Sequence, residues 1–299
     1  MLAALHVPTS AVEEPPPPVV NAEKVVVLSD FNEVLYEHGA HDRVGPASLT
    51  KMMTALVAVR YGDLSTTVTV EQHDLIGEAT MGLVLGDQLS LGDVLYGLLM
   101  PSGNDAALAI ARTIGWRSGD QNPEQSVARF IGMMNQTAIE MGLRDTHFMN
   151  PHGLDEWGHY SSAYDMALIL RAALNHVEIR ERMQTLAIRV GSNYDLYNGN
   201  ELLRTRADYV GGKTGLTDAC GFCLAAAARP ADRLVIAVVM RDDWSWFWDV
   251  GLLLDYGLQL EQLRGIPEWA DAAMVGTQLN QPRERTVPPV SALPGTQLP

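Results

Sequence analysis

Residues 46–56 read Pro-Ala-Ser-Leu-Thr-Lys-Met-Met-Thr-Ala-Leu, and the rest of the chain is best understood outward from this run. Apolar side chains between positions 49 and 59 cover much of a helical surface, which predicts a buried helix over residues 48–60. Serine suits a helix N-terminus and Pro46 lies just before it, so Ser48 is expected to open the helix. Residues three apart share a helix face, which puts Lys51 one turn behind the Ser48 hydroxyl.

Lysine is scarce in this chain, which has only Lys24, Lys51 and Lys213 against eighteen arginines. Arginine keeps its proton in proteins, whereas a desolvated lysine can become a neutral base near pH 7. Burial between methionines would lower the pKa of Lys51 and favour the neutral amine. The pattern therefore predicts a nucleophile, Ser48, with its base within reach and no requirement for histidine.

A second motif, Ser102-Gly103-Asn104, lies in a break between two apolar helices predicted over residues 89–99 and 106–114. A hydroxyl and an amide on one short loop suit a proton relay and a hydrogen bond that orients a substrate. Taken alone, the same residues would also fit ordinary capping between helices.

The third motif lies in Tyr209–Thr217, a predicted strand rich in glycine. Glycine inside a strand often marks the close approach of another backbone or a ligand. A ligand backbone could add along this edge, with Lys213 and Thr214 facing a carboxylate. Two further strands, predicted at 222–228 and 234–240, suggest an antiparallel meander.

Ser-x-x-Lys, Ser-x-Asn and Lys-Thr-Gly, in this order, resemble the signature set of the penicillin-recognising serine enzymes. The flanking residues 46–56, 150–154 and 158–165 resemble the D-alanyl-D-alanine carboxypeptidase branch of the low-molecular-mass penicillin-binding proteins. The resemblance runs from about Val25 to Leu260. It implies an α/β (α+β) domain of the β-lactamase/transpeptidase type. Its antiparallel five-stranded sheet would have helices on both faces, with the site at the edge strand that carries Lys213.

The resemblance also implies a reaction, the removal of the terminal D-alanine from peptidoglycan stem peptides through an acyl-enzyme. Ser48 would attack the peptide carbonyl while Lys51 takes its proton. Ser102 would pass a proton to the departing nitrogen, and Asn104 would hold the acyl side. β-Lactam antibiotics would acylate the same serine, and neither a metal nor an organic cofactor is needed.

Substrate-binding roles follow from the same resemblance. Lys213, Thr214 and Gly215 would bind the terminal carboxylate end of the substrate. The oxyanion would lie between the backbone N–H groups of Ser48 and Leu216. Gly212 departs from the pattern, because a bulky aliphatic residue is expected there.

Composition excludes other classes of protein. The net charge of −15 argues against nucleic-acid partners. No apolar run approaches the roughly 20 residues that span a bilayer, so no transmembrane segment is expected. An extracytoplasmic location follows from the resemblance, although residues 1–11 lack the form of an intact signal peptide.

Three segments are expected along the chain. Residues 1–22 would be an N-terminal remnant with a stiff proline-rich linker, and residues 23–264 a serine carboxypeptidase domain. Residues 265–299, rich in proline and polar residues, would be a disordered tail, too short for the β-rich second domain that many family members carry.

Cysteine and histidine carry weaker signals. Cys220 and Cys223 fall at the start of a predicted strand, where residues three apart lie roughly 10 Å from each other. They are therefore expected to be half-buried core thiols too far apart for a disulfide. His147, His152 and His159 match no usual metal-ligand spacing, and His152 is expected near the site in a supporting role only.

Five residues near the C-terminus recur at helical spacing, which predicts a core-facing helix. They are Trp244, Phe247, Trp248, Leu252 and Tyr256. Trp246 points elsewhere on that helix, where it could contact lipid or a partner.

Two rival functions remain open. A class A-type β-lactamase shares the three motifs but adds a glutamate followed four residues on by asparagine, and here Glu156 is followed by Tyr160 instead. A non-catalytic penicillin-binding or sensor domain would keep the site without turnover, and no residue favours it.

Overall fold

The computed structural model describes residues 14–230 and 233–264. A five-stranded sheet in the order β2-β1-β9-β8-β7 organises this part of the chain, and every neighbouring pair is antiparallel. The strands are β1 (Lys24–Leu28), β2 (Val34–His38), β7 (Tyr209–Thr217), β8 (Gly221–Ala228) and β9 (Val235–Asp242). The expected five-stranded antiparallel sheet is confirmed, with β7 at one edge.

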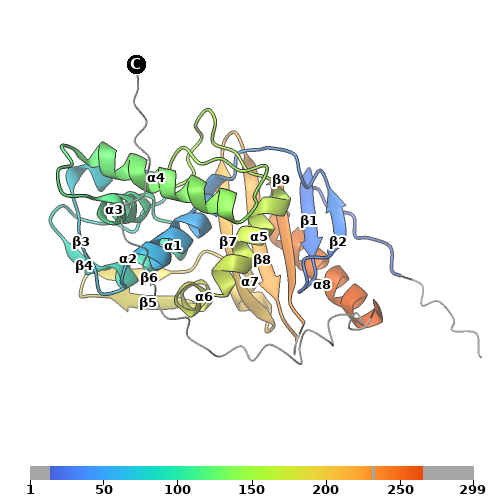
Figure 1. Ribbon diagram of the computed structural model, residues 1–299. Helices are drawn as coiled ribbons and strands as arrows, with labels where there is room; N and C mark the ends of the chain where they lie inside the picture. The colour runs from blue at the N-terminus through green and yellow to red at the C-terminus, as the bar shows by residue number, and fades with distance from the viewer. Residues whose placement is uncertain (1–13, 231–232, 265–299) are drawn as a thin grey trace, which may run out of the picture. The chain divides into compact units, whose positions relative to one another are not determined.

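Helices cover both faces of this sheet, as expected (Figure 1). On one face α5 (Ala163–Leu174) packs across the strands, and on the other lies α8 (Trp246–Arg264). Side chains of β9 alternate between the two cores, with Ile236 and Val238 in one and Ala237 and Val239 in the other. Successive strand residues point to opposite faces, so a central strand covered on both sides is apolar throughout.

A helical region lies beside the β7 edge of the sheet (Figure 1). Its central helix, α1 (Thr50–Tyr61), is buried continuously from residue 50 to residue 58, as the apolar pattern predicted. The remaining elements are η1 (Ala47–Leu49), β3 (Thr67–Thr69), η2 (Gln72–Asp74), β4 (Gln88–Ser90), α2 (Leu91–Leu99), α3 (Asn104–Gly115), α4 (Pro123–Glu140), α6 (Val177–Gln184), β5 (Ala187–Val190), β6 (Tyr194–Tyr197) and α7 (Leu202–Thr205).

The start of the central helix differs slightly from the prediction. Ser48 lies in the short 3-10 turn η1, and the α-helix begins two residues later at Thr50. Ala47, just before the serine, has a φ of 47°, a conformation that non-glycine residues seldom adopt. The serine is therefore presented on a tight turn that leads into a buried helix.

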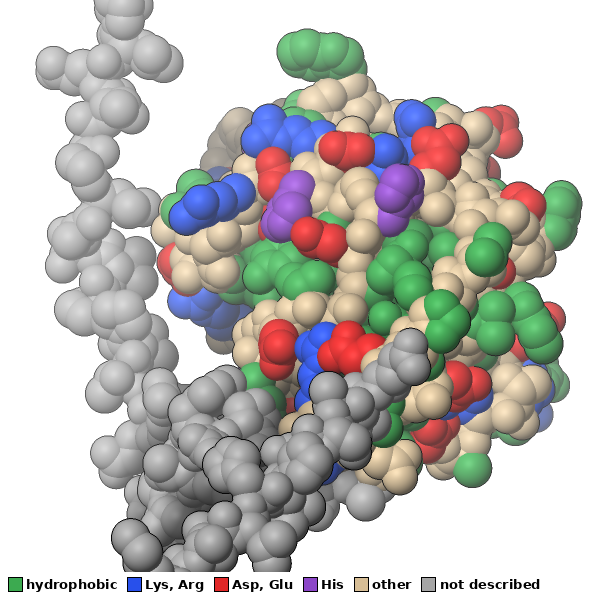
Figure 2. Space-filling view, turned by 90° about the vertical axis from the view of Figure 1, so that its right-hand side faces the viewer, with side chains coloured by type: hydrophobic (Ala, Val, Ile, Leu, Met, Phe, Trp, Pro, Cys, Tyr) green, Lys and Arg blue, Asp and Glu red, His purple; other side chains and the backbone are tan. Residues whose placement is uncertain are grey.

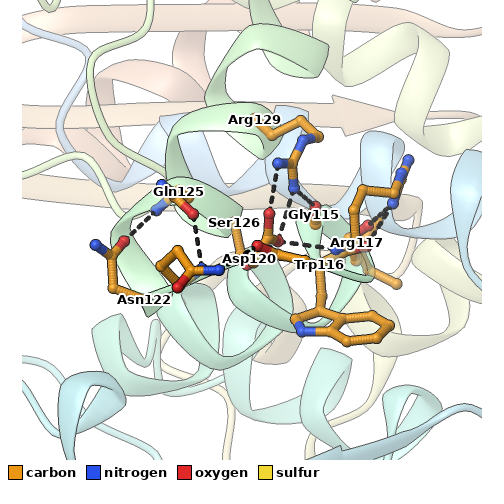
Figure 3. Close-up of polar contacts among 11 residues, drawn as sticks. Gly115, Trp116, Arg117, Asp120, Asn122, Gln125, Ser126 and Arg129 are labelled. Atoms are coloured by element: carbon orange, nitrogen blue, oxygen red, sulfur yellow. Dashed lines mark hydrogen bonds and ion pairs between the residues drawn. The ribbon is translucent and has the colours of Figure 1, made fainter.

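The junction between α3 and α4 is held by a charged cluster around Asp120 (Figure 3). The two terminal guanidinium nitrogens of Arg129, Nη1 and Nη2, donate to the Asp120 carboxylate at 2.9 and 2.7 Å. The Ser126 hydroxyl and the backbone N–H of Arg117 add two more hydrogen bonds, each 2.8 Å long. These donors hold the pKa of Asp120 well below its usual range, with the Arg129 hydrogen bond as the largest cause.

The C-terminal helix faces the sheet with residues other than those predicted. Its buried positions include Val250, Leu253, Leu254 and Leu260, whereas the side chains of Trp244 and Trp248 are exposed at 86% and 70%. Leu252 is partly buried, and Phe247 and Tyr256 pack against the core. The prediction of a core-facing aromatic stripe was therefore wrong for the two tryptophans.

Close packing explains this choice of face. A Cβ atom at Gly257 would lie 2.6 Å from the Val235 side chain and 2.7 Å from that of Val27. The helix approaches the sheet too closely for a side chain at that point, so the face with Gly257 and the aliphatic residues is turned inward.

The segment before β1 packs onto this domain near its end. Ala22 is buried in the core under α8, and the backbone N–H of Asn21 donates to Asp249 Oδ2 at 2.6 Å. Residues 14–21 have neither helix nor strand. The expectations for residues 1–13 and for the tail 265–299 lie outside the described residues.

The length of the helices and the distribution of surface charge were compared with the expectations for membrane and nucleic-acid partners. None of the helices in 14–230 and 233–264 is long and apolar enough to cross a membrane. Seen from the side of β1 and β2, acidic and basic side chains are interspersed on the surface (Figure 2). Where side chains are coloured in this view, no continuous basic patch is visible.

Candidate active site

The three sequence motifs meet in one cleft between the β7 edge, the η1 turn and the loop before α3. The cleft has a volume of about 280 Å³. It is lined by Ser48, Glu78, Ala79, Ser102, Asn104, Leu154, Thr214, Gly215, Leu216, Thr217 and Trp246.

Lys51 lies beneath the cleft with its side-chain amine fully buried. Its Nζ lies 2.9 Å from Ser48 Oγ, 2.7 Å from Asn104 Oδ1 and 2.6 Å from the backbone oxygen of His152. Burial is the main cause that lowers the pKa of Lys51 well below its ordinary value, and the nearby charge of Lys213 acts in the same direction. The structure thus brings the first two motifs into direct contact.

The carbonyl that contacts Lys51 is held by the loop at residues 150–154. Asn150 accepts a 2.7 Å hydrogen bond from the N–H of Gly153, and it donates to the oxygen of Leu154 at 3.0 Å. Thr54 on α1 donates to the oxygen of Pro151 at 2.6 Å. Gly153 has a φ of 96°, and a Cβ there would lie 1.9 Å from the Ala47 oxygen. The loop therefore packs directly under the turn that presents the serine.

The Ser102–Asn104 loop is joined to the edge strand through Lys213. Lys213 Nζ donates to Ser102 Oγ at 2.9 Å and to the oxygen of Thr214 at 2.8 Å. Burial lowers the pKa of Lys213 to about 7. Ser102 has a φ of 65°, so a non-glycine residue holds a strained conformation at this point. Asn104 contacts Lys51 from the first turn of α3.

The edge strand passes close to the serine turn. A Cβ on Gly215 would lie 3.0 Å from both Ala47 Cβ and the backbone nitrogen of Ser48. The glycine thus marks the close approach of another backbone, as its place in the strand suggested. Leu216 follows with a side chain that is 54% exposed.

The family model for D-alanyl-D-alanine carboxypeptidases, peptidase family S11, matches residues 10–243. The chain belongs to this family of serine peptidases.

Individual relatives agree with the family. The chain is 35% identical to D-alanyl-D-alanine carboxypeptidase DacF of Bacillus subtilis over 72% of its length and 56% of that protein. It is also 35% identical to DacD of Escherichia coli, with 81% of this chain and 62% of that protein covered. It therefore spans about three-fifths of the length of these curated relatives.

Solved structures of the family share the fold. The Streptomyces K15 DD-transpeptidase superimposes with a TM-score of 0.77 at 27% identity, over 81% of this chain and 99% of that chain. A putative penicillin-binding protein homologue of Mycobacterium tuberculosis gives a TM-score of 0.76 at 28% identity, over 84% and 97%. The expected penicillin-binding, β-lactamase-like fold is confirmed.

The glycine that departs from the family pattern, Gly212, is fixed by packing. A Cβ at this position would lie 2.4 Å from the Ala225 oxygen and 3.2 Å from the Tyr209 hydroxyl. The buried Tyr209 accepts a 3.0 Å hydrogen bond from Asn200. Because a Cβ would collide with the backbone of β8, and the phenol is close as well, a side chain has no room at Gly212.

The prediction for the two cysteines was wrong in its geometry. Cys220 Sγ and Cys223 Sγ lie 3.2 Å apart, and both thiols are fully buried. Cys220 precedes β8, Gly221 has a φ of 68°, and the β8–β9 register shifts between Phe222 and Leu224. The chain is therefore bent where a straight strand would have separated the two sulfur atoms.

The histidines tie the loop over residues 147–160 together. His159 Nε2 lies 2.9 Å from Thr50 Oγ1, and its Nδ1 accepts from the N–H of Met149 at 2.9 Å. Burial lowers the pKa of His159 to about 4 and that of His152 to about 3. Within 14–230 and 233–264 no cluster of three or more His, Cys, Asp or Glu side chains could hold a metal ion. His152 contacts Lys51 through its backbone oxygen.

Glu78 and Trp246 line the cleft although the sequence-based prediction did not place them there. Glu78 lies on the loop whose carbonyl oxygens at Gly77 and Ala79 accept hydrogen bonds from Asn104. Trp246, for which the sequence left contact with lipid or a partner open, lies at the cleft wall, and its ring centre is 5.1 Å from that of Phe222. Neither belongs to a recurring motif, so no signal in the sequence pointed to the cleft.

Proposed function

We propose that this chain is a serine-type D-Ala-D-Ala carboxypeptidase that removes the terminal D-alanine from peptidoglycan stem peptides. The observation that carries the proposal is the 2.9 Å contact between the fully buried Lys51 Nζ and Ser48 Oγ. A serine hydroxyl is a weak nucleophile until a base accepts its proton. Lys51 is the base within reach of Ser48.

The partners of Lys51 leave room for the lone pair of a neutral amine. Asn104 Oδ1 and the oxygen of His152 can only accept hydrogen bonds. A neutral amine has two N–H groups and one lone pair, so donation to both oxygens leaves the lone pair for the Ser48 hydroxyl. Burial stabilises this form. Ser48 then gives its proton to Nζ as Oγ attacks the peptide carbonyl.

The substrate is proposed to add to the free edge of β7 as an antiparallel strand. Its terminal carboxylate would lie at Lys213 and Thr214, next to Gly215. The scissile carbonyl would then lie between the backbone N–H groups of Ser48 and Leu216, which stabilise the oxyanion. The close approach of the strand to the serine turn supports this arrangement.

Ser102 is proposed to deliver the proton to the departing D-alanine nitrogen. Its hydroxyl lies 2.9 Å from Lys213 Nζ, so the lysine can restore the proton that Ser102 gives up. Asn104, bound to Lys51, would orient the acyl side of the substrate. Water then hydrolyses the ester on Ser48 and releases the shortened peptide.

β-Lactams carry a strained amide and a carboxylate, so they should acylate Ser48 in the same pose. Peptidoglycan lies outside the cytoplasmic membrane, and the proposed location is therefore extracytoplasmic.

The test is intact-protein mass spectrometry after addition of benzylpenicillin, followed over hours, with Ser48→Ala as the control. A stable penicilloyl adduct on the wild type alone is expected, together with D-alanine release from a pentapeptide substrate. No adduct and no D-alanine release would contradict the proposal and favour a binding or sensor domain.

A class A-like β-lactamase is the enzymatic alternative, and the same time course separates it from the carboxypeptidase. Glu156 is exposed, and its Oε2 accepts a 3.0 Å hydrogen bond from Asn150 outside the cleft lining. A fleeting adduct with destruction of the antibiotic would favour the lactamase.

A further inference from the structure

A second and larger depression lies on the α8 face of the sheet, beside the catalytic cleft. This depression, the aromatic groove, has a volume of about 870 Å³. Its apolar wall consists of Phe222, Trp244, Trp246, Phe247, Trp248 and Leu252. A concave, mostly apolar depression with a few polar groups at its rim is the usual form of a ligand-binding site.

Four rings of the aromatic groove contact one another in series, those of Trp244, Phe222, Trp246 and Phe247. The Phe222 ring lies 4.7 Å from that of Trp244 and 5.1 Å from that of Trp246, between ring centres. Trp244 and Trp248 nevertheless expose 86% and 70% of their surface. Most of the surface of these two residues is therefore accessible to a ligand, and Trp244 is supported by its contact with Phe222.

The aromatic groove continues from the catalytic cleft. Trp246 lines both depressions. Phe222 on β8 is paired with Leu216 on β7, so the two side chains point to the same face of the sheet. A ligand that leaves the cleft past Leu216 on the α8 face therefore meets Phe222 and Trp246 first.

The proposed binding mode determines which end of the bound stem peptide extends past Leu216. A substrate antiparallel to β7 with its carboxylate at Lys213 has its earlier residues beyond Leu216, toward Thr217. That portion is the part of the stem peptide that leads back to the amino sugar to which the peptide is attached. The aromatic end of the groove, with Phe222 and Trp246, thus lies toward the sugar-bearing end of the substrate. Its polar side, with Arg206 and Asp255, lies along α8 toward the start of β7.

The volume of the aromatic groove and its polar lining residues indicate the kind of ligand that it could bind. A volume of about 870 Å³ exceeds what one amino-acid side chain fills and is in the range of pockets for larger ligands. Glu201, Thr205, Arg206 and Asp255 lie along its polar side. Carboxylates can accept hydrogen bonds from sugar hydroxyls, and aromatic faces pack against the apolar faces of sugar rings.

Charge argues against a membrane at this surface. Arg206 is bonded to Asp255 at 2.8 Å and to Asp208 at 2.9 Å, so its charge is balanced by the protein. The chain as a whole carries a net charge of −15. Anionic headgroups would be repelled, whereas hydroxyl and acetamido groups would not.

We infer that the aromatic groove is an extended subsite that binds the amino-sugar end of the peptidoglycan substrate. This inference rests on the proposed carboxypeptidase function, because it uses the direction of the bound stem peptide. The catalytic cleft would bind the D-Ala-D-Ala end, and the aromatic groove would distinguish glycan-linked peptides from free ones.

The test compares two substrates of the full chain, a disaccharide-pentapeptide and a short N-acetylated tripeptide ending in D-Ala-D-Ala. The readout is the ratio of their kcat/KM values for D-alanine release. Trp248→Ala should lower this ratio at least fivefold. Trp157→Ala removes a ring that is 95% exposed and lines neither depression, so the ratio should stay as in the wild type.

A direct binding measurement keeps the inference independent of activity. Tryptophan fluorescence is titrated with the peptide-free disaccharide of N-acetylglucosamine and N-acetylmuramic acid. Saturable quenching is expected in the wild type and in Trp157→Ala, and its loss in Trp248→Ala. An unchanged substrate ratio, no response to the disaccharide, or a response to anionic vesicles alone would overturn the inference. Absence of D-alanine release from both substrates, with sugar binding intact, would instead contradict the proposed function.

Discussion

Lys51 Nζ lies 2.9 Å from Ser48 Oγ at the bottom of the cleft, and its side chain has no exposure to solvent. The role proposed for this contact requires that the amine can lose its proton. Lys51→Arg keeps a cation but removes the titratable base, since arginine stays charged. Acylation by benzylpenicillin should slow by roughly 10²- to 10⁴-fold, the usual contribution of a general base.

Rapid-mixing kinetics of penicilloyl-adduct formation would measure this effect, with circular dichroism as the control for folding. An acylation rate within tenfold of the wild type would exclude Lys51 as the base.

The pH dependence of substrate binding should report on Lys213. Its pKa of about 7 lies below that of a free lysine, so the charged fraction falls as the pH rises through neutrality. If the ammonium binds the substrate carboxylate, the affinity should weaken by about tenfold between pH 6 and pH 8, from the fraction protonated at each pH. Steady-state KM values across this range give the measurement.

Lys213→Arg provides the matched comparison, because arginine stays charged over the whole range. The affinity of this variant should be nearly independent of pH between 6 and 8. A wild-type KM that also stays flat would mean that Lys213 does not bind the carboxylate through its charge.

Gly153 should tolerate no side chain. A Cβ would meet the Ala47 oxygen at 1.9 Å, and the φ of 96° disfavours any L-residue. Gly153→Ala is expected to lower the free energy of unfolding by about 2 kcal/mol or more. Because the collision falls on the turn before Ser48, acylation should slow as well. Urea denaturation and adduct formation measure the two effects.

Gly132→Ala is the control for that substitution. Gly132 lies inside α4, where no atom is within 4 Å of the position that a Cβ would occupy. Alanine should stabilise this helix by roughly 0.5–1 kcal/mol and leave acylation unchanged. Equal stability of the two variants would argue against the packing of the loop at 150–154 under the serine turn.

The Asp120 cluster should make part of the stability dependent on pH. The pKa of this carboxyl is lowered in the folded chain, so the folded state binds fewer protons than the unfolded state at acid pH. The stabilisation is complete above the unfolded value of about 4 and is lost as the pH falls below it. Asp120→Asn should lower the melting temperature at pH 7, and the difference from wild type should narrow at lower pH.

Asp195→Asn is the control here. Its carboxylate is 56% exposed and lies 3.7 Å from Arg189, an arrangement that contributes little to stability. The measurement is the melting temperature of the wild type, Asp120→Asn and Asp195→Asn between pH 3 and pH 7. If both variants lost the same melting temperature relative to wild type, the hydrogen bonds of Asp120 would contribute no more to stability than an exposed ion pair does.

The two buried thiols should form a disulfide under oxidising conditions. With the sulfurs 3.2 Å apart, each has to move by only about 1 Å or less to reach the bonding distance near 2.05 Å. The hydrogen bond from Cys223 is the largest cause that lowers the pKa of Cys220, which favours the thiolate. Oxidised glutathione would accept the two electrons and leave as two thiols, and the protein mass would fall by about 2 Da.

Cys223→Ser cannot form this bond and should lose no mass. An unchanged mass of the wild type after prolonged oxidation, with normal thiol reactivity once unfolded, would contradict the prediction.

Local sequence was enough for the elements that depend on nearest neighbours. The burial of α1 and the serine cap of α2 follow from apolar periodicity and from Ser90, whose side chain accepts from the N–H of Asp93. The strands at 209–242 follow from short apolar runs separated by turns. In contrast, β1 pairs with β9 across more than two hundred residues, and no local pattern specifies that register.

Local sequence patterns gave wrong predictions where packing between elements distant in the sequence determines the structure. The face that α8 turns to the sheet depends on close contact at Gly257 with side chains of β1 and β9. The Cys220–Cys223 contact depends on a left-handed glycine and a register shift at the start of β8.

The spacing of Ser48 and Lys51 fixed their proximity, because three residues make about one turn at the start of a helix. The groups that surround the Lys51 amine belong to segments that are distant in the sequence. Asn104 on α3 and the oxygen of His152 surround Lys51 Nζ, and Trp246 from α8 forms part of the cleft wall. Local geometry can be encoded in a few consecutive residues, whereas burial and hydrogen-bond partners arise only when segments separated by 50 to 200 positions are packed together.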